Sequence, residues 1–157
     1  MNAFLILEDG TVFKGTSIGS TKEIISEIVF NTSMWGYLEV LTDPSYAGQA
    51  VCMTYPLIGN YGICHEDMES LKPWPDGYIV HELSRMPSNF RSDDTIQHFL
   101  EEHDIPGIAG IDTRALTKMI MQILWRERFI LIMVSGIHIV LHGQGMDCLH
   151  RPKQQSC

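Results

Sequence analysis

The sequence lacks an excess of basic residues. Of its 157 residues, 11 are Lys or Arg and 19 are Asp or Glu, which gives a formal net charge of −8. Phosphate binding requires clustered Lys and Arg, so this composition argues against a nucleic-acid-binding protein. The acidic excess is also uneven, because residues 1–118 hold 7 basic and 17 acidic residues whereas residues 119–157 hold 4 and 2. The C-terminal stretch therefore differs chemically from the rest of the chain.

Several other signals are missing. The cysteines Cys52, Cys64, Cys148 and Cys157 form no C-x-x-C pair, and the chain opens with neither a basic segment nor a cleavable apolar one. These features favour a cytoplasmic protein. An apolar run at residues 129–141 is too short to cross a bilayer, so no membrane association is expected. The sequence has no G-x-x-x-x-G-K phosphate loop, and we expect no cofactor.

The remaining composition is that of one globular domain that begins with β-structure. Residues 4–7 and 11–13 flank Asp9-Gly10, which predicts a hairpin closed by a tight primed turn. The run Ile24 to Phe30 is rich in branched and aromatic side chains and predicts an inner strand. Further strands are predicted at residues 49–55, 78–80 and 108–111, with a loop over most of residues 59–77.

Two helices are predicted in the second half of the chain. The first begins after Ser92 as N-cap and ends before Pro106, with Ile96, Phe99 and Leu100 on one face. The second is capped by Asp112 and carries an apolar face that includes Leu116 and Ile120. Strands that precede helices predict an α+β domain, with a mainly β core covered by helices.

Five stretches of sequence carry a family resemblance. Residues 29–49 read VFNTSMWGYLEVLTDPSYAGQ, and residues 55–62 read YPLIGNYG. They are supported by LEDGT at residues 7–11, PSNFR at residues 87–91 and IPGIAGIDTRALT at residues 105–117. Taken in their order along the chain, these motifs resemble those of the small subunit of glutamine-dependent carbamoyl phosphate synthetase. The resemblance covers residues 1–118 and is confined to the amino-terminal, non-catalytic domain of that family.

The resemblance implies a fold and a role. The expected fold is a swivelling β/β/α-type domain. In the family, a second domain hydrolyses glutamine, and the ammonia passes to a large subunit that uses ATP and bicarbonate to make carbamoyl phosphate for arginine and pyrimidine synthesis. The expected partner is that large subunit, with L-glutamine bound only if the amidotransferase domain is supplied. We expect residues 1–118 to form the amino-terminal domain and the amidotransferase domain to be absent.

Ser45 is the one site residue that the resemblance supplies, as a contributor to the glutamine pocket. A hydroxyl on a turn fixed by Pro44 can donate and accept hydrogen bonds to an amino-acid substrate. The alternative is that Ser45 only satisfies a nearby backbone group, as serines after Asp-Pro commonly do. Likewise, residues 59–62 either line the boundary between domains at which Ser45 would contact glutamine, or form only a tight turn.

The chain also departs from the family pattern. The family usually has Met-Thr-Gly-Tyr-Gln-Glu where this chain has MWGYLE at residues 34–39, so Trp35 and Leu38 replace polar residues. If these positions face the partner or the glutamine pocket, both contacts are in doubt. Residues 119–157 resemble nothing in the family, and our hypothesis is that this tail is frameshifted or misjoined.

A cysteine hydrolase and a metal-binding module are the two alternative functions. A cysteine hydrolase needs a thiolate on a glycine-flanked elbow with a His and a carboxylate nearby. Cys64 comes nearest, beside His65 and Glu66, but lacks the second glycine, so we predict no catalytic residue and no glutaminase activity from the chain alone. A metal-binding module could use the tail residues His138, His142, Cys148 and His150, but they lack the paired C-x-x-C of a convincing zinc site, and we predict no metal there.

Overall fold

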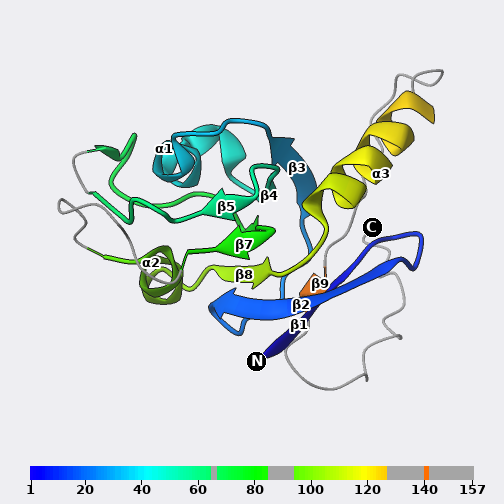
Figure 1. Cartoon of the computed structure of the whole chain (residues 1–157), viewed down its shortest axis with the longest axis horizontal. Coiled ribbons are helices and arrows are strands. Elements are labelled where there is room, and N and C mark those ends of the chain that lie inside the picture. Colours follow the sequence, from blue (N-terminus) through cyan, green and yellow to red (C-terminus); the bar gives the residue numbers. More distant parts are fainter. Residues whose placement is uncertain (65–66, 85–93, 127–139, 142–157) are drawn as a thin grey trace, which may run out of the picture.

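The computed structural model describes residues 1–64, 67–84, 94–126 and 140–141, with side chains described as far as residue 122. Its main element is a seven-stranded mixed sheet in the order β3-β4-β6-β8-β2-β1-β9 (Figure 1). The strands in this order are β3 (Glu27–Asn31), β4 (Gln49–Met53), β6 (Gly77–Ile79), β8 (Pro106–Ala109), β2 (Val12–Gly19), β1 (Asn2–Ile6) and β9 (Val140–Leu141). Two short strands, β5 (Leu57–Ile58) and β7 (Glu82–Leu83), pair separately.

One half of the large sheet is parallel. Strands β3, β4, β6 and β8 run side by side in the same direction. Helix α1 (Tyr37–Thr42) and the 3-10 turn η1 (Pro44–Tyr46) connect β3 to β4. The prediction that the 24–30 region is an inner strand is wrong, because β3 begins at Glu27 and stands at the edge of the large sheet, with β4 as its one neighbour among the described strands. β-rich composition indicates burial of one face but does not tell an edge strand from a central one.

The other half of the sheet is antiparallel and starts with the predicted hairpin. Strand β1 pairs with β2, and β2 pairs with β8. The predicted primed turn is wrong. Gly10 has a positive φ of 85°, but Asp9 does not, and the Leu7 amide donates to the Thr11 carbonyl across a three-residue connection. A type I turn followed by a left-handed glycine is the usual form of such a loop.

Strand β8 passes close to its neighbours. A Cβ added to Gly107 would lie 2.7 Å from Ile18 Cγ1 and 2.9 Å from the Tyr78 carbonyl oxygen. Glycine therefore allows β8 to lie between β2 and β6, which joins the antiparallel and parallel halves into one sheet.

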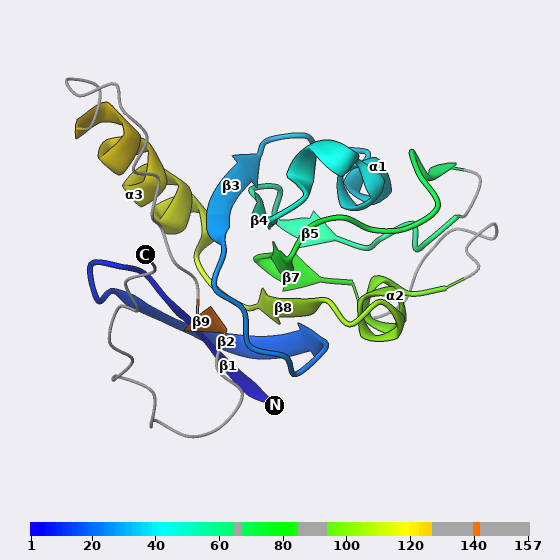
Figure 2. The ribbon, with the colours of Figure 1, turned by 180° about the vertical axis from the view of Figure 1, so that it is seen from behind.

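Side chains alternate between two apolar layers, one on each face of the sheet. Val51 and Met53 of β4 face a layer that contains α1 and α2 (Ile96–Glu102), whereas Ala50 and Cys52 face a layer that contains α3 (Thr113–Arg126). Figure 2 shows these elements from behind. The fold is therefore a mixed sheet covered by helices, which confirms the α+β character that the order of elements predicted.

The predicted start of α3 is correct, whereas the predicted start of α2 is not. Asp112 Oδ1 accepts from the Ala115 amide at 2.9 Å, which confirms the predicted cap of α3. Helix α2 begins at Ile96 rather than after Ser92, because the Thr95 hydroxyl accepts from the His98 amide at 3.2 Å. Ser92 itself lies outside the described residues. No helix in the described part of the chain is both long and apolar enough to span a bilayer.

Candidate functional site

Ser45 lies on an exposed turn between α1 and β4. The Asp43 side chain caps η1, because its Oδ1 atom accepts from the Ser45 amide at 2.8 Å and from the Ser45 hydroxyl at 2.7 Å. These hydrogen bonds hold the pKa of the Asp43 carboxyl below its usual 3.8. The Ser45 hydroxyl hydrogen is thus directed at Asp43, while its oxygen can still accept a hydrogen bond from a ligand.

The C-terminal side of the turn is anchored by two contacts near the start of β4. Tyr46, next to Ser45, has its hydroxyl 3.0 Å from Asn31 Nδ2, at the end of β3. Just beyond, the Ser26 hydroxyl contacts the Gly48 carbonyl at 2.7 Å and Asp76 Oδ2 at 3.0 Å. Ser45 is therefore held at a fixed position on the surface.

The 59–62 segment forms a tight turn with a structural task. The Gly62 amide donates to the Gly59 carbonyl at 3.2 Å, and the Tyr37 hydroxyl donates to the Gly62 carbonyl at 2.7 Å. The Tyr61 hydroxyl accepts from the amides of Gly36 and Tyr37 at 2.9 and 3.2 Å, and the rings of Tyr37 and Tyr61 stack at 4.0 Å. Burial raises the pKa of Tyr61. This turn therefore supports the start of α1.

The two departures from the family pattern have opposite environments. Leu38 is 1% exposed and belongs to the apolar layer around α1. Trp35 is 75% exposed, and Met34 beside it is 57% exposed. Of these two changes, the one at residue 35 alters the surface of the domain and the one at residue 38 alters its core.

Neither described cysteine lies at an exposed site. Cys52 is fully buried, and this burial raises the pKa of its thiol to about 12. Cys64 is 6% exposed, while His65 and Glu66 lie outside the described residues, as do the tail residues His138, His142, Cys148 and His150.

A cleft of about 470 Å³ lies beside α2, and Ser45 is not among the residues that line it. It is lined by residues of β2, α2, the ends of β7 and β8 and their flanks, namely Thr16, Ile18, residues 81–84, Thr95, Gln97, His98, Glu101, Ala109 and Gly110. We call it the α2 cleft. The His81 imidazole is held there by the Ile111 carbonyl, 2.7 Å from Nδ1.

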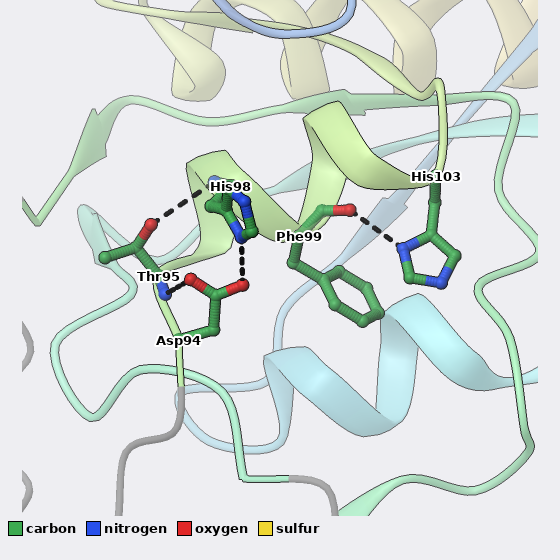
Figure 3. Close-up of polar contacts among 5 residues, drawn as sticks. All are labelled: Asp94, Thr95, His98, Phe99 and His103. Atoms are coloured by element: carbon green, nitrogen blue, oxygen red, sulfur yellow. Dashed lines mark hydrogen bonds and ion pairs between the residues drawn. The ribbon is translucent and has the colours of Figure 1, made fainter.

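A group of possible metal ligands includes His98 of the α2 cleft and two residues outside its lining, Asp94 and Glu102. His98 Nδ1 contacts Asp94 Oδ2, while Asp94 Oδ1 accepts from the Thr95 amide at 2.6 Å (Figure 3). The hydrogen bond between the His98 and Asp94 side chains and the negative charge of the Asp94 carboxylate raise the pKa of His98. Ligand atoms of Asp94, His98 and Glu102 all lie within 4.8 Å of one another. Sequence reasoning missed this group, although the spacing of four residues was a visible signal.

A family model resolves the relationship of the chain to known proteins. Residues 5–124 match the model described as carbamoyl-phosphate synthase small chain, CPSase domain. The chain belongs to this family. The match to the CPSase domain continues past residue 118 and ends within α3.

Similar proteins carry the same family name. The carbamoyl phosphate synthase small chain of Oceanobacillus iheyensis is 61% identical over 116 residues, 74% of this chain and 32% of that protein. The small chain of Fusobacterium nucleatum is 59% identical over 117 residues, and that of Bacillus caldolyticus 55% over 122 residues. They cover 74% and 78% of this chain and 33% and 34% of those proteins. The CPSase-domain chain thus spans about a third of the length of these relatives.

Proposed function

We propose that the chain acts as the amino-terminal, non-catalytic domain of a carbamoyl phosphate synthase small chain. In this role it supports a glutamine-hydrolysing neighbour and helps attach it to the large subunit, which uses the released ammonia to make carbamoyl phosphate. The match of residues 5–124 to the CPSase-domain family carries the proposal. The alternative of an independent hydrolase or metal module built on Cys64 or the tail finds no support in these relatives, which are all small chains.

The domain division follows from this proposal. Residues 1–118 form the working domain and residues 119–157 the tail, of which residues 119–124 still belong to the family match. A mixed sheet with α1 and α2 on one face and α3 on the other is compatible with the swivelling β/β/α type. Support for arginine and pyrimidine synthesis in the cytoplasm belongs to the same proposal and rests on the family alone.

Ser45 is the residue through which this domain would contact glutamine. Its hydroxyl donates to Asp43, so its oxygen is the atom that can accept a hydrogen bond from the ammonium or amide group of the substrate. Exposure of the turn and its anchoring to the sheet support this role. The residue binds substrate and takes no part in breaking the amide bond.

A chimaeric small chain tests the proposal. Residues 1–118 of this chain replace the matching segment of the Oceanobacillus iheyensis small chain, and the chimaera is purified with the large subunit of that organism. We expect the two to copurify and to synthesise carbamoyl phosphate from glutamine. Ser45→Ala should raise KM for glutamine about tenfold with little change in kcat, because a hydrogen bond to a charged group contributes about 1.5 kcal/mol or more.

Two comparisons sharpen the test. Ser33→Ala, at another exposed serine, serves as the matched control and should leave KM unchanged. The unmodified chain alone should release no glutamate from glutamine. Failure of the chimaera to bind the large subunit would contradict the docking role, whereas equal KM values for Ser45→Ala and Ser33→Ala would contradict only the role of Ser45.

A further inference from the structure

Three side chains with metal-binding groups lie together at α2. His98 and Glu102 lie one turn apart on the same side of the helix, and Asp94 directly precedes the helix cap, Thr95. Each offers one ligand atom, and all three atoms lie within 4.8 Å of one another. Because metal–ligand distances of 2.0–2.2 Å place two ligands no more than about 4.4 Å apart, a small side-chain rotation brings all three atoms within reach of one metal ion.

The backbone beneath these ligands is fixed. Thr95 caps α2 through the His98 amide, and the Asp94 carboxylate accepts from the Thr95 amide. Phe99 and Leu100, on the opposite face of α2, are 1% and 0% exposed and hold the helix against the sheet. The helix therefore presents the three ligands without a need for folding on binding, which would otherwise lower the affinity.

The surroundings leave space for a cation and its water ligands. The Asp94 side chain is 25% exposed and that of His98 is 65% exposed, so the group can be reached from solvent. His98 also lines the α2 cleft, whereas Asp94 and Glu102 are not among its lining residues. Water from the exposed side of the group can fill the positions that three protein ligands leave open.

The donor set selects the kind of metal. One imidazole nitrogen and two carboxylate oxygens suit zinc, whose open sites commonly have three protein ligands and a water. We propose that Asp94, His98 and Glu102 bind one Zn²⁺ ion. Binding replaces the hydrogen bond between Asp94 and His98 by bonds from both side chains to the metal, and neutral His98 provides the nitrogen lone pair. The site is independent of Ser45 and of the proposed function.

Calorimetric titration of the full chain with Zn²⁺ tests the site. All variants carry a background in which the tail ligands are removed by His138→Asn, His142→Asn, Cys148→Ser and His150→Asn. We expect one equivalent of Zn²⁺ to bind to this background protein. Either His98→Asn or Glu102→Gln should weaken that binding about tenfold or more. Titration with Co²⁺ should give visible absorption bands that His98→Asn removes.

Glu101→Gln is the matched control, because Glu101 neighbours Glu102 and has the same charge but lies outside the group of ligands. It should keep the affinity of the background protein. Circular dichroism establishes that each variant is folded. Unchanged Zn²⁺ affinity in His98→Asn, or an equal loss in Glu101→Gln and Glu102→Gln, would overturn the proposal, since the second result indicates general attraction to negative charge.

Discussion

Ser45 and Asp43 together build the turn between α1 and β4. The carboxylate receives both hydrogen bonds that Ser45 donates, and these stabilise the ionised form of Asp43. Its pKa in the folded chain is therefore below 3.8. By linkage, the contribution of this carboxylate to stability is present above pH 3.8 and is lost as the pH falls through the depressed pKa.

Ser45→Ala should move the pKa of Asp43 upward toward 3.8, because one of the two hydrogen bonds to the carboxylate is removed. An NMR pH titration of the Asp43 side chain measures this change. Asp9, whose pKa is lowered by hydrogen bonds from Thr11, is the internal control and should titrate identically in both proteins. An unchanged pKa at Asp43 would show that the hydroxyl does not stabilise the carboxylate.

Helix α1 is an element that local sequence could not indicate. Its N-cap, Gly36, has a φ of 77° and supplies no side chain to the first turn. The missing acceptor comes from the Tyr61 hydroxyl, 25 residues away from Gly36. Helix α3, in contrast, carries its cap in Asp112 three residues before Ala115, so sequence alone predicts its start. Predictability thus depends on whether the cap is local.

Tyr61→Phe should lower the free energy of unfolding by about 1–2 kcal/mol, because the amides of Gly36 and Tyr37 lose their shared acceptor while the stacked ring remains. Urea denaturation followed by circular dichroism measures the loss. Tyr55→Phe is the control, since Tyr55 is 36% exposed and should change stability little. Equal stability of the two variants would mean that water replaces the Tyr61 hydroxyl without loss.

The Ser45 turn and the α2 cleft also differ in whether their residues are close together in the sequence. The Ser45 turn is local, and Asp43, Pro44 and Ser45 predict it together. The α2 cleft combines residues of β2, of the β7 region, of α2 and of the end of β8, which only the sheet order brings together. Because sheet order depends on pairing between distant strands, a single sequence predicts the strands of this cleft but not the cleft itself.

At the scale of the whole molecule, helices cover both faces of the sheet, with α1 and α2 on one face and α3 on the other. Cys52 lies in the layer beneath α3, with Leu116 and Ile120 of that helix. Burial makes its thiol both inaccessible and hard to ionise, with a pKa of about 12. Alkylation requires a thiolate in contact with the reagent, so the reactivity of Cys52 reports on opening of this layer.

Cys52 should resist iodoacetamide at pH 8 in the native chain and react only as the chain unfolds. Peptide mass spectrometry follows its modification as urea is raised, beside circular dichroism. Leu116→Ala should increase the labelling rate about tenfold or more, because loss of a buried leucine side chain costs about 2–5 kcal/mol. Met121→Ala, at a residue 45% exposed on the same helix, should not. Native labelling as fast as that of a free thiol would contradict the packing of α3.

The position of β8 also bears on how the domain is made. Strands β1 and β2 are synthesised before β8, whose residues 106–109 pair with β2 but come far later in the chain. An isolated two-stranded hairpin is only marginally stable in water, so the β1–β2 hairpin gains its second partner only after β8 has been made. Until then, the apolar side of this hairpin is a surface on which a chaperone could act.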